Sequence, residues 1–119
     1  LVSSPADYDR FQQMLVAGGQ FAGRRIMAEA SVRLATSNLL PEGVDTAGTW
    51  VAGEGFGAGG RVTGTAFGWG GAAGTAAFVD MASGLRAALF TQYMPAEAYP
   101  IQRGFPELVQ KDLAAMKGV

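Results

Sequence analysis

The side chains that could take part in catalysis are few, because the 119 residues include no histidine and no cysteine. A Ser-His-Asp triad, a thiol nucleophile and metal sites built from Cys or His are therefore excluded. Acid–base chemistry would need a carboxylate, Lys or Tyr, or groups supplied by another chain. We expect neither a metal ion nor a cofactor.

The five serines lack the patterns that mark a catalytic nucleophile. None lies in Gly-x-Ser-x-Gly, and none is followed three residues later by Lys. Ser4 is typical of a helix cap and Ser83 of a turn. The acidic residues are scattered, and no pair shares a helix face within an apolar stripe, so the sequence gives no support to glycosidase-like chemistry.

The 18 glycines produce two matches to a dinucleotide-binding pattern, Gly55-x-Gly57-x-x-Gly60 and Gly68-x-Gly70-x-x-Ala73. Because residues 61–65 are strand-like and the pattern requires a helix there, we reject nucleotide binding. A net charge of −1 gives no general footprint for nucleic acid.

The glycine-rich segments leave two interpretations open. Small residues let a helix pack close to a sheet, or they let the backbone approach a ligand. Packing is favoured for residues 53–60, whereas the two are evenly balanced for residues 69–74. Trp50, Phe56 and Trp69 flank these segments and are candidates for lining a cleft. Four other phenylalanines fit core faces: Phe11, Phe78, Phe90 and Phe105.

Apolar periodicity and turn residues predict the elements that would position these groups. A helix should begin after the Ser4 cap and end at Gly18-Gly19. A second helix is predicted over residues 28–36, between a short link over residues 20–25 and a loop over residues 37–50. A third helix is predicted over residues 105–117, after a linker over residues 94–103. Strands are predicted over residues 53–63, 65–69, 73–79 and 85–92.

This order predicts an α+β fold, in which N-terminal and C-terminal helices flank an antiparallel sheet of three to four strands. The length fits one domain. We expect residues 1–50 to form a helical part and loop, residues 51–92 a strand meander, and residues 93–119 a linker and helix. No apolar run approaches the roughly 20 residues that span a membrane, and the sequence does not indicate a compartment.

Two stretches carry a resemblance to a known family. Residues 1–11 (LVSSPADYDRF) resemble the "LVSTxxDYxRF" helix of serine β-lactamase-like hydrolases, a group that includes class C β-lactamases, penicillin-binding-protein-type peptidases and family VIII carboxylesterases. Residues 67–75 (FGWGGAAGT), followed by Phe78-Val79-Asp80 and residues 89–92 (LFTQ), resemble the "GWGGAAGTxFWVDP…MTQ" block of the esterase-like branch. The resemblance covers essentially the whole chain but only about the C-terminal third of such an enzyme.

The resemblance implies an acyl-enzyme hydrolase of α+β fold that uses three motifs. Only the third, a Lys-Thr-Gly-like triplet beside the cleft, has a counterpart, Trp69-Gly70-Gly71. By this resemblance, Trp69, Gly70 and Gly71 bind substrate, and the backbone N–H of Ala72 is an oxyanion donor. The glycines would keep the strand edge clear for the acyl group, and an indole in place of Lys favours neutral esters.

The other two motifs, Ser-x-x-Lys and Tyr-x-Asn, do not occur in the sequence. The first hypothesis is therefore that this chain is part of such a hydrolase and is inactive alone, its partner being the N-terminal portion of the same enzyme and its substrate a small ester or amide. A start at Leu1 looks like a cut inside a longer polypeptide. The second hypothesis is a stand-alone, non-catalytic α+β module that binds a protein partner through its sheet edge. Under the first hypothesis this edge is exposed because the family's first two strands are absent, and an exposed edge invites self-association or strand addition.

Overall fold

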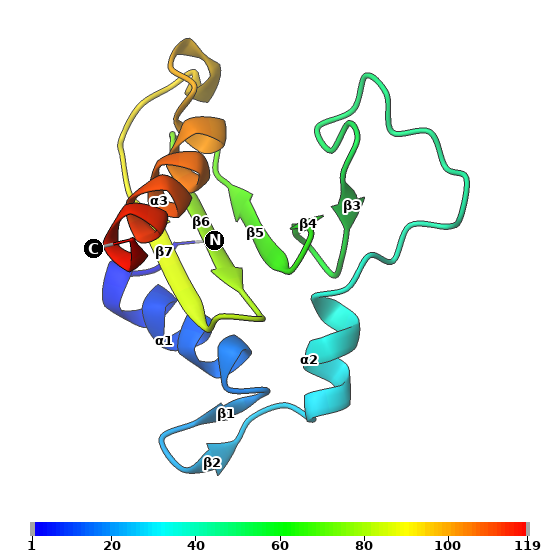
Figure 1. The fold of residues 1–119 in the computed structure, drawn as a ribbon, viewed down its shortest axis with the longest axis vertical. Helices are drawn as coiled ribbons and strands as arrows, with labels where there is room; N and C mark the ends of the chain where they lie inside the picture. The colour runs from blue at the N-terminus through cyan, green and yellow to red at the C-terminus, as the bar shows by residue number, and fades with distance from the viewer. Residues whose placement is uncertain (1, 119) are drawn as a thin grey trace.

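In a computed structural model, which describes residues 2–118, the chain forms an α+β fold of three layers (Figure 1). A five-stranded antiparallel sheet has α1 (Pro5–Val16) and α2 (Glu29–Ala35) on one side and α3 (Ile101–Lys117) on the other. The α+β class predicted from the sequence is confirmed. Within residues 2–118, no helix is long and apolar enough to cross a membrane.

Helix α1 begins and ends at the residues that the sequence predicted. The Asp7 N–H donates to Ser4 Oγ at 3.1 Å, and Ser4 Oγ donates back to the Asp7 carboxylate at 2.8 Å. At the other end, Gly18 has a φ of 61°, and the Gly19 N–H donates to Met14 O at 2.8 Å. A glycine in this left-handed conformation satisfies carbonyls that the helix leaves open.

The segment expected as a short link instead forms a small hairpin of β1 (Gln20–Phe21) and β2 (Arg24–Arg25). Its two-residue turn has positive φ at both Ala22 (48°) and Gly23 (75°). Such turns favour Asn-Gly or Asp-Gly. Because alanine occupies the first position, the sequence did not predict a hairpin here.

The strands follow one another across the sheet in chain order. Each neighbouring pair is antiparallel. The strands are β3 (Gly55–Phe56), β4 (Arg61–Thr63), β5 (Ala66–Gly70), β6 (Ala76–Asp80) and β7 (Leu85–Leu89).

Five strands form, rather than the three to four predicted, because residues 53–63 fold into two short strands instead of one. The turn between them is closed by the Gly57 N–H, which donates to Gly60 O at 2.8 Å. A Cβ on Gly57 would lie 2.4 Å from Ala35 O, and one on Gly60 would lie 2.7 Å from the Phe67 ring. Close packing therefore explains these two glycines, and the strand β4 after Gly60 removes the helix that nucleotide binding would need.

The buried core lies between α1, α2 and the sheet. Met14 and Leu15 of α1, Val32 of α2 and Val79 of β6 form one apolar cluster. On the opposite face, the Phe105 ring of α3 packs edge-on against Phe78, with ring centroids 6.1 Å apart. Phe11 and Phe90, which the sequence placed in the core, are 45% and 44% exposed, because they lie at the end of the α1–β7 contact, beside Tyr8.

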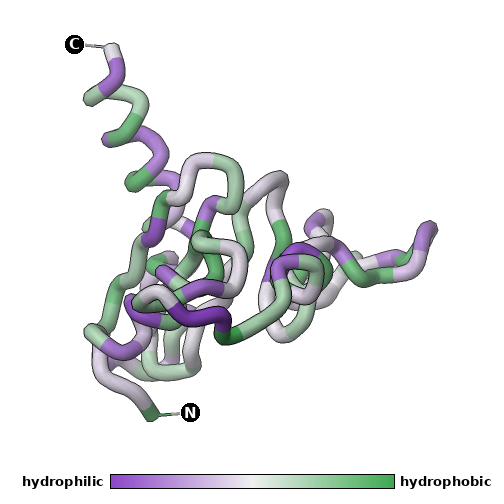
Figure 2. Tube along the Cα trace, turned by 90° about the horizontal axis from the view of Figure 1, so that it is seen from below, coloured by the Kyte–Doolittle hydropathy of each residue, from purple (hydrophilic) through white to green (hydrophobic). Residues whose placement is uncertain are grey.

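Helix α3 starts four residues earlier than predicted and is only loosely attached. None of its described residues is fully buried, and its C-terminal turns project from the body of the molecule (Figure 2). The accessible surface is 7940 Å², whereas a folded monomer of 12.3 kDa exposes roughly 6,100 Å². The excess of about 1,800 Å² is comparable to the total area buried in a stable protein–protein interface.

The β6–β7 turn is held by the carboxylate of Asp80. It accepts hydrogen bonds from Thr65 Oγ1 at 2.6 Å, Ser83 Oγ at 2.7 Å and the Ala82 N–H at 3.0 Å. These bonds, that from Thr65 first, hold the pKa of Asp80 below its ordinary value. Gly84, with a φ of 74°, completes the turn, as the sequence predicted.

We predict that Asp80→Asn makes folding less sensitive to acid. The folded-state pKa of Asp80 is lowered, so its carboxylate stabilises the fold above the unfolded pKa of about 3.9. That contribution is lost as the pH falls through the folded pKa. Urea unfolding at neutral pH and near pH 3 should show a larger loss of unfolding free energy for the wild type than for the variant. Equal losses would contradict the prediction, and Glu42→Gln, in an exposed loop, serves as the charge-matched control.

Candidate active-site cleft

A cleft of about 890 Å³ lies between the end of β5, the β3–β4 hairpin and α3. All four residues that the resemblance assigned to a site, Trp69, Gly70, Gly71 and Ala72, line it. The structure therefore brings the predicted site residues to one place. Further lining residues come from the β3–β4 side (Trp50, Glu54, Arg61 and Thr63) and from the α3 side (Ala96, Glu97, Gln102, Arg103, Pro106, Glu107 and Gln110).

The triplet occupies a stretch of β5 whose outer edge is open. Strand β4 pairs with β5 only as far as Gly68. Trp69 and Gly70 pair with Ala77 and Ala76 of β6 on one side, and no strand within residues 2–118 pairs with them on the other. The backbone at this point can therefore be approached from the cleft.

Ala72 lines the cleft, and its N–H makes no hydrogen bond within residues 2–118. The preceding N–H, that of Gly71, is used inside the β5–β6 turn, where it donates to Thr75 O at 3.0 Å. For the Ala72 N–H, by contrast, no group in residues 2–118 is an acceptor. Ala72 itself is exposed. An exposed, unpaired N–H in a cleft can stabilise a developing oxyanion.

The resemblance implies open space over Gly70 and Gly71. In the structure, other side chains occupy this space. A Cβ on Gly70 would lie 2.3 Å from Gln102 Cδ, and one on Gly71 would lie 2.3 Å from Thr75 Oγ1. The Gln102 amide donates to Gly71 O at 2.8 Å and to Thr75 O at 3.3 Å. Packing of the Gln102 side chain against the turn is therefore one physical reason for a glycine at position 70, and the clearance for an acyl group that the resemblance implies stays a prediction.

Trp69 stands at the mouth of the cleft and is 41% exposed. Its ring packs edge-on against Phe56, with centroids 5.5 Å apart, and the Arg61 guanidinium lies 5.6 Å from the ring centroid. Trp50, which is 72% exposed, contributes its carbonyl oxygen as an acceptor for Arg61 Nη2 at 2.7 Å. Trp50 and Trp69 thus both line the cleft, as the sequence predicted for them, and Phe56 supports Trp69.

The positive charge of Arg61, which lies beside Trp69, is balanced by the carboxylate of Glu54. Arg61 Nε lies 2.7 Å from the Glu54 carboxylate, and both side chains are about 30% exposed. Glu54 also accepts from Thr63 Oγ1 at 2.9 Å. Among the lining residues, the remaining charges are Glu97, Arg103 and Glu107, so the cleft offers no excess of positive charge to an anionic ligand.

The residues that line the cleft include none of the groups that serve a serine hydrolase of this type as nucleophile and base. There is no Ser, Tyr or Lys among them, and the one hydroxyl, that of Thr63, already donates to Glu54. The serines lie elsewhere: Ser4 caps α1, Ser83 bonds Asp80, and Ser37 donates to Leu34 O. Within residues 2–118, no group of three acidic side chains is close enough to hold a metal ion.

Comparison with models of known protein families gives no match, and comparison with curated proteins finds no similar sequence. The interpretation of the cleft therefore depends on its own geometry and on the resemblance carried by residues 67–75.

Three residues important to the cleft were missed in the sequence. Gln102 was placed in a linker over residues 94–103, because Pro95 and Pro100 indicated one there. Glu54 and Arg61 lie seven residues apart in what was expected to be one strand, where opposite charges at an odd separation would point to opposite faces. The turn at residues 57–60 brings the two side chains together instead.

We predict that Gly70→Ala lowers the unfolding free energy by about 1 kcal/mol, because the new methyl group displaces the Gln102 amide and breaks its bond to Gly71 O. In a Gln102→Ala background the same change should cost much less, since there is no amide to displace. Urea unfolding of the four variants measures this coupling. Additive effects would contradict it. Gly68→Ala is the matched comparison: its Cβ would lie 2.2 Å from a backbone atom, Ala77 O, so Gln102→Ala should not rescue it.

Proposed function

We propose that this chain is the C-terminal part of a serine β-lactamase-like hydrolase of the esterase type. In this proposal it supplies one wall of the cleft through Trp69, Gly70 and Gly71, and one oxyanion donor through the Ala72 N–H. The observation that carries the proposal is this N–H, unpaired and exposed at the end of an open strand edge that lines a cleft. The nucleophile and its base come from outside these 119 residues.

The electrostatics of the cleft favour a neutral ester as the substrate. Trp69 has no charge, and the guanidinium stacked beside it is paired with Glu54. Binding a substrate carboxylate would require this ion pair to separate, which has a cost in a partly buried site. The surface excess of about 1,800 Å², calculated from the 7940 Å² total and the scaling for monomers, is consistent with a second protein portion that covers this chain.

The proposal is tested by removing the one N–H that it assigns to catalysis. We predict that Ala72→Pro, in the polypeptide that joins this chain to a portion carrying Ser-x-x-Lys, lowers kcat for p-nitrophenyl butyrate about 10²–10³-fold. Ala72→Ser keeps the N–H and should retain most of the activity. Proline at this position breaks no hydrogen bond of residues 2–118. Ala72 is the second residue of a four-residue turn in which the Gly74 N–H donates to Gly71 O at 3.1 Å, a position that proline favours.

The 119-residue chain by itself is the second arm of this test. It should turn over neither p-nitrophenyl butyrate nor nitrocefin, and a fluorophosphonate should not label it, because its cleft lacks a nucleophile. Turnover by the isolated chain would contradict the assignment of the nucleophile to another portion. Equal kcat values for Ala72→Pro and Ala72→Ser would contradict the role of the N–H.

One observation favours a second candidate, a non-catalytic module that binds a protein through its sheet edge. Strand β7 pairs only with β6, so its outer edge could accept an added strand. Light scattering separates the two candidates. A compact, stable monomer that needs no further chain to remain folded would favour the independent module, whereas self-association or dependence on a second portion favours the hydrolase.

A further inference from the structure

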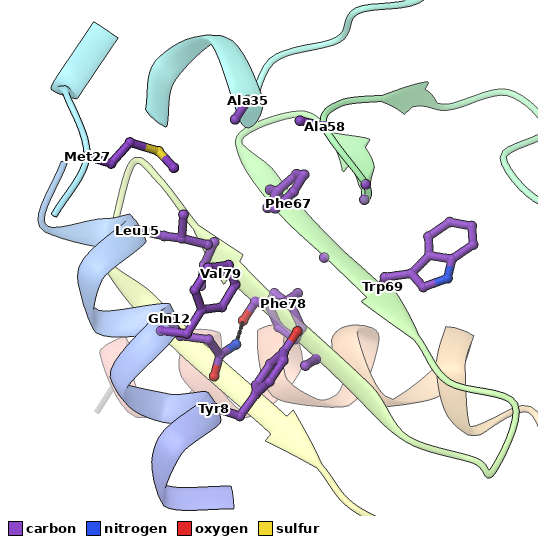
Figure 3. A pocket seen from close by; sticks show the side chains of 15 residues that line it. Tyr8, Gln12, Leu15, Met27, Ala35, Ala58, Phe67, Trp69, Phe78 and Val79 are labelled. Carbon is purple, nitrogen blue, oxygen red and sulfur yellow. Dashed lines mark hydrogen bonds between the residues drawn. The ribbon is translucent and has the colours of Figure 1, made fainter. Parts of the chain in front are cut away.

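A second, smaller cavity lies on the opposite side of the sheet from α3, between α1 and strands β5 and β6 (Figure 3). Its volume is about 240 Å³. Leu15, Phe67 and Val79 form apolar walls, and Ala35 at the end of α2 and Ala58 in the β3–β4 turn close one end. Gln12, the Tyr8 hydroxyl and the Trp69 indole N–H are the polar side-chain groups of the residues that line it.

Gln12 is the buried polar residue of this cavity, with only 3% of its surface exposed. Its Nε2 donates to Phe78 O at 3.0 Å and to Ala87 O at 3.3 Å. Two carbonyl acceptors require the NH₂ group on their side, so the orientation of the amide is fixed and Oε1 faces the other way. No group in residues 2–118 donates to this Oε1, which leaves a buried residue with an unused acceptor beside an apolar cavity.

The size of the cavity limits what it can hold. A cavity of about 150 Å³ with apolar walls accepts benzene, so 240 Å³ corresponds to roughly nine or ten non-hydrogen atoms. The Tyr8 ring extends from α1 towards Phe78 (Figure 3), and burial raises the pKa of its hydroxyl. The lining residues carry no charged side chain, so an ionised ligand would be desolvated without a partner.

We propose that this cavity is a binding site for a small neutral molecule, bicyclic or of similar bulk, that carries one N–H or O–H donor for Gln12 Oε1. The apolar body of the ligand would lie against Leu15, Phe67 and Val79. This site lies on the α1 side of the sheet, whereas the proposed catalytic cleft lies towards α3, and Gly68, Trp69, Ala77 and Phe78 border both cavities. The inference does not depend on the proposed function.

Indole is a suitable probe, because it has nine non-hydrogen atoms, no charge and one N–H donor. The chain has two tryptophans, of which Trp69 lines this cavity and Trp50 does not. In ¹⁵N-labelled protein, indole should shift the Trp69 Nε1–H resonance saturably, with a Kd of the order of 0.1–1 mM, and leave that of Trp50 unchanged. The assignment of the two resonances comes from Trp69→Phe.

Two matched comparisons test the contacts. The ligand 1-methylindole has no donor and should bind roughly fivefold more weakly than indole. Ala35→Leu should fill the cavity and weaken indole binding at least about tenfold, whereas Ala30→Leu, on the exposed side of the same helix, should leave it unchanged. If thermal melting shows that Ala35→Leu does not fold, Ala58→Leu replaces it.

Three results would overturn the inference. The first is a shift of Trp50 without a shift of Trp69, which would place the ligand elsewhere. The second is equal affinity for indole and 1-methylindole, which would remove the role of Gln12 Oε1. The third is undiminished indole binding by a folded Ala35→Leu or Ala58→Leu variant, which would show that the cavity is not the site. Loss of esterase activity in any experiment would bear on the proposed function and not on this site.

Discussion

The Gln102 amide is the interaction on which the cleft depends. It connects the first turn of α3 to two carbonyl oxygens of the β5–β6 turn, those of Gly71 and Thr75. The same turn is tied to the segment after β7, where Thr91 Oγ1 donates to Gly74 O at 2.6 Å and the Tyr93 N–H donates to Ala73 O at 2.9 Å. These bonds fix the end of β5, and with it the position of Trp69 and the direction of the Ala72 N–H. The bonds of Gln102 are important for the position of α3, because none of the described residues of this helix is fully buried.

The second constraint is the late start of β4. Because β4 runs antiparallel to β5 and Arg61 pairs with Gly68, an earlier start would place residues 60 and 59 opposite Trp69 and Gly70 and close this edge of the sheet. Instead β4 starts at Arg61, whose guanidinium lies 5.6 Å from the Trp69 ring centroid and is paired with the Glu54 carboxylate. The resulting cleft is lined mostly by apolar surface and has no excess of positive charge, and the Trp69 ring in its wall packs against Phe56. In the proposed function, these properties favour a neutral ester as the substrate, and the reactive groups come from another portion.

Local signals in the sequence predicted much of the fold. The Ser4 cap, the Gly18-Gly19 end and the Asp80–Gly84 turn each have a cause within a few residues, and each forms as predicted. Two elements were predicted wrongly. The hairpin at residues 20–25 was missed because Ala22 takes a conformation that favours Gly or Asn. The 53–63 segment was expected as one strand, but it bends because Gly57 and Gly60 pack against Ala35 and Phe67, which are distant in sequence. For the cleft, the sequence identified the four residues around the triplet. It could not identify Gln102, whose role depends on a contact across 31 positions.

The central claim is that the backbone after the triplet presents one unpaired N–H to the cleft, and amide hydrogen exchange measures this directly. In the 119-residue chain, the Gly71 N–H, bonded to Thr75 O, should be protected from exchange. The neighbouring Ala72 N–H should exchange at nearly the rate of an unstructured peptide, since it is exposed and has no acceptor within residues 2–118. Strong protection of Ala72, at a level similar to that of Gly71, would show that this N–H is already engaged and would contradict its availability for an oxyanion.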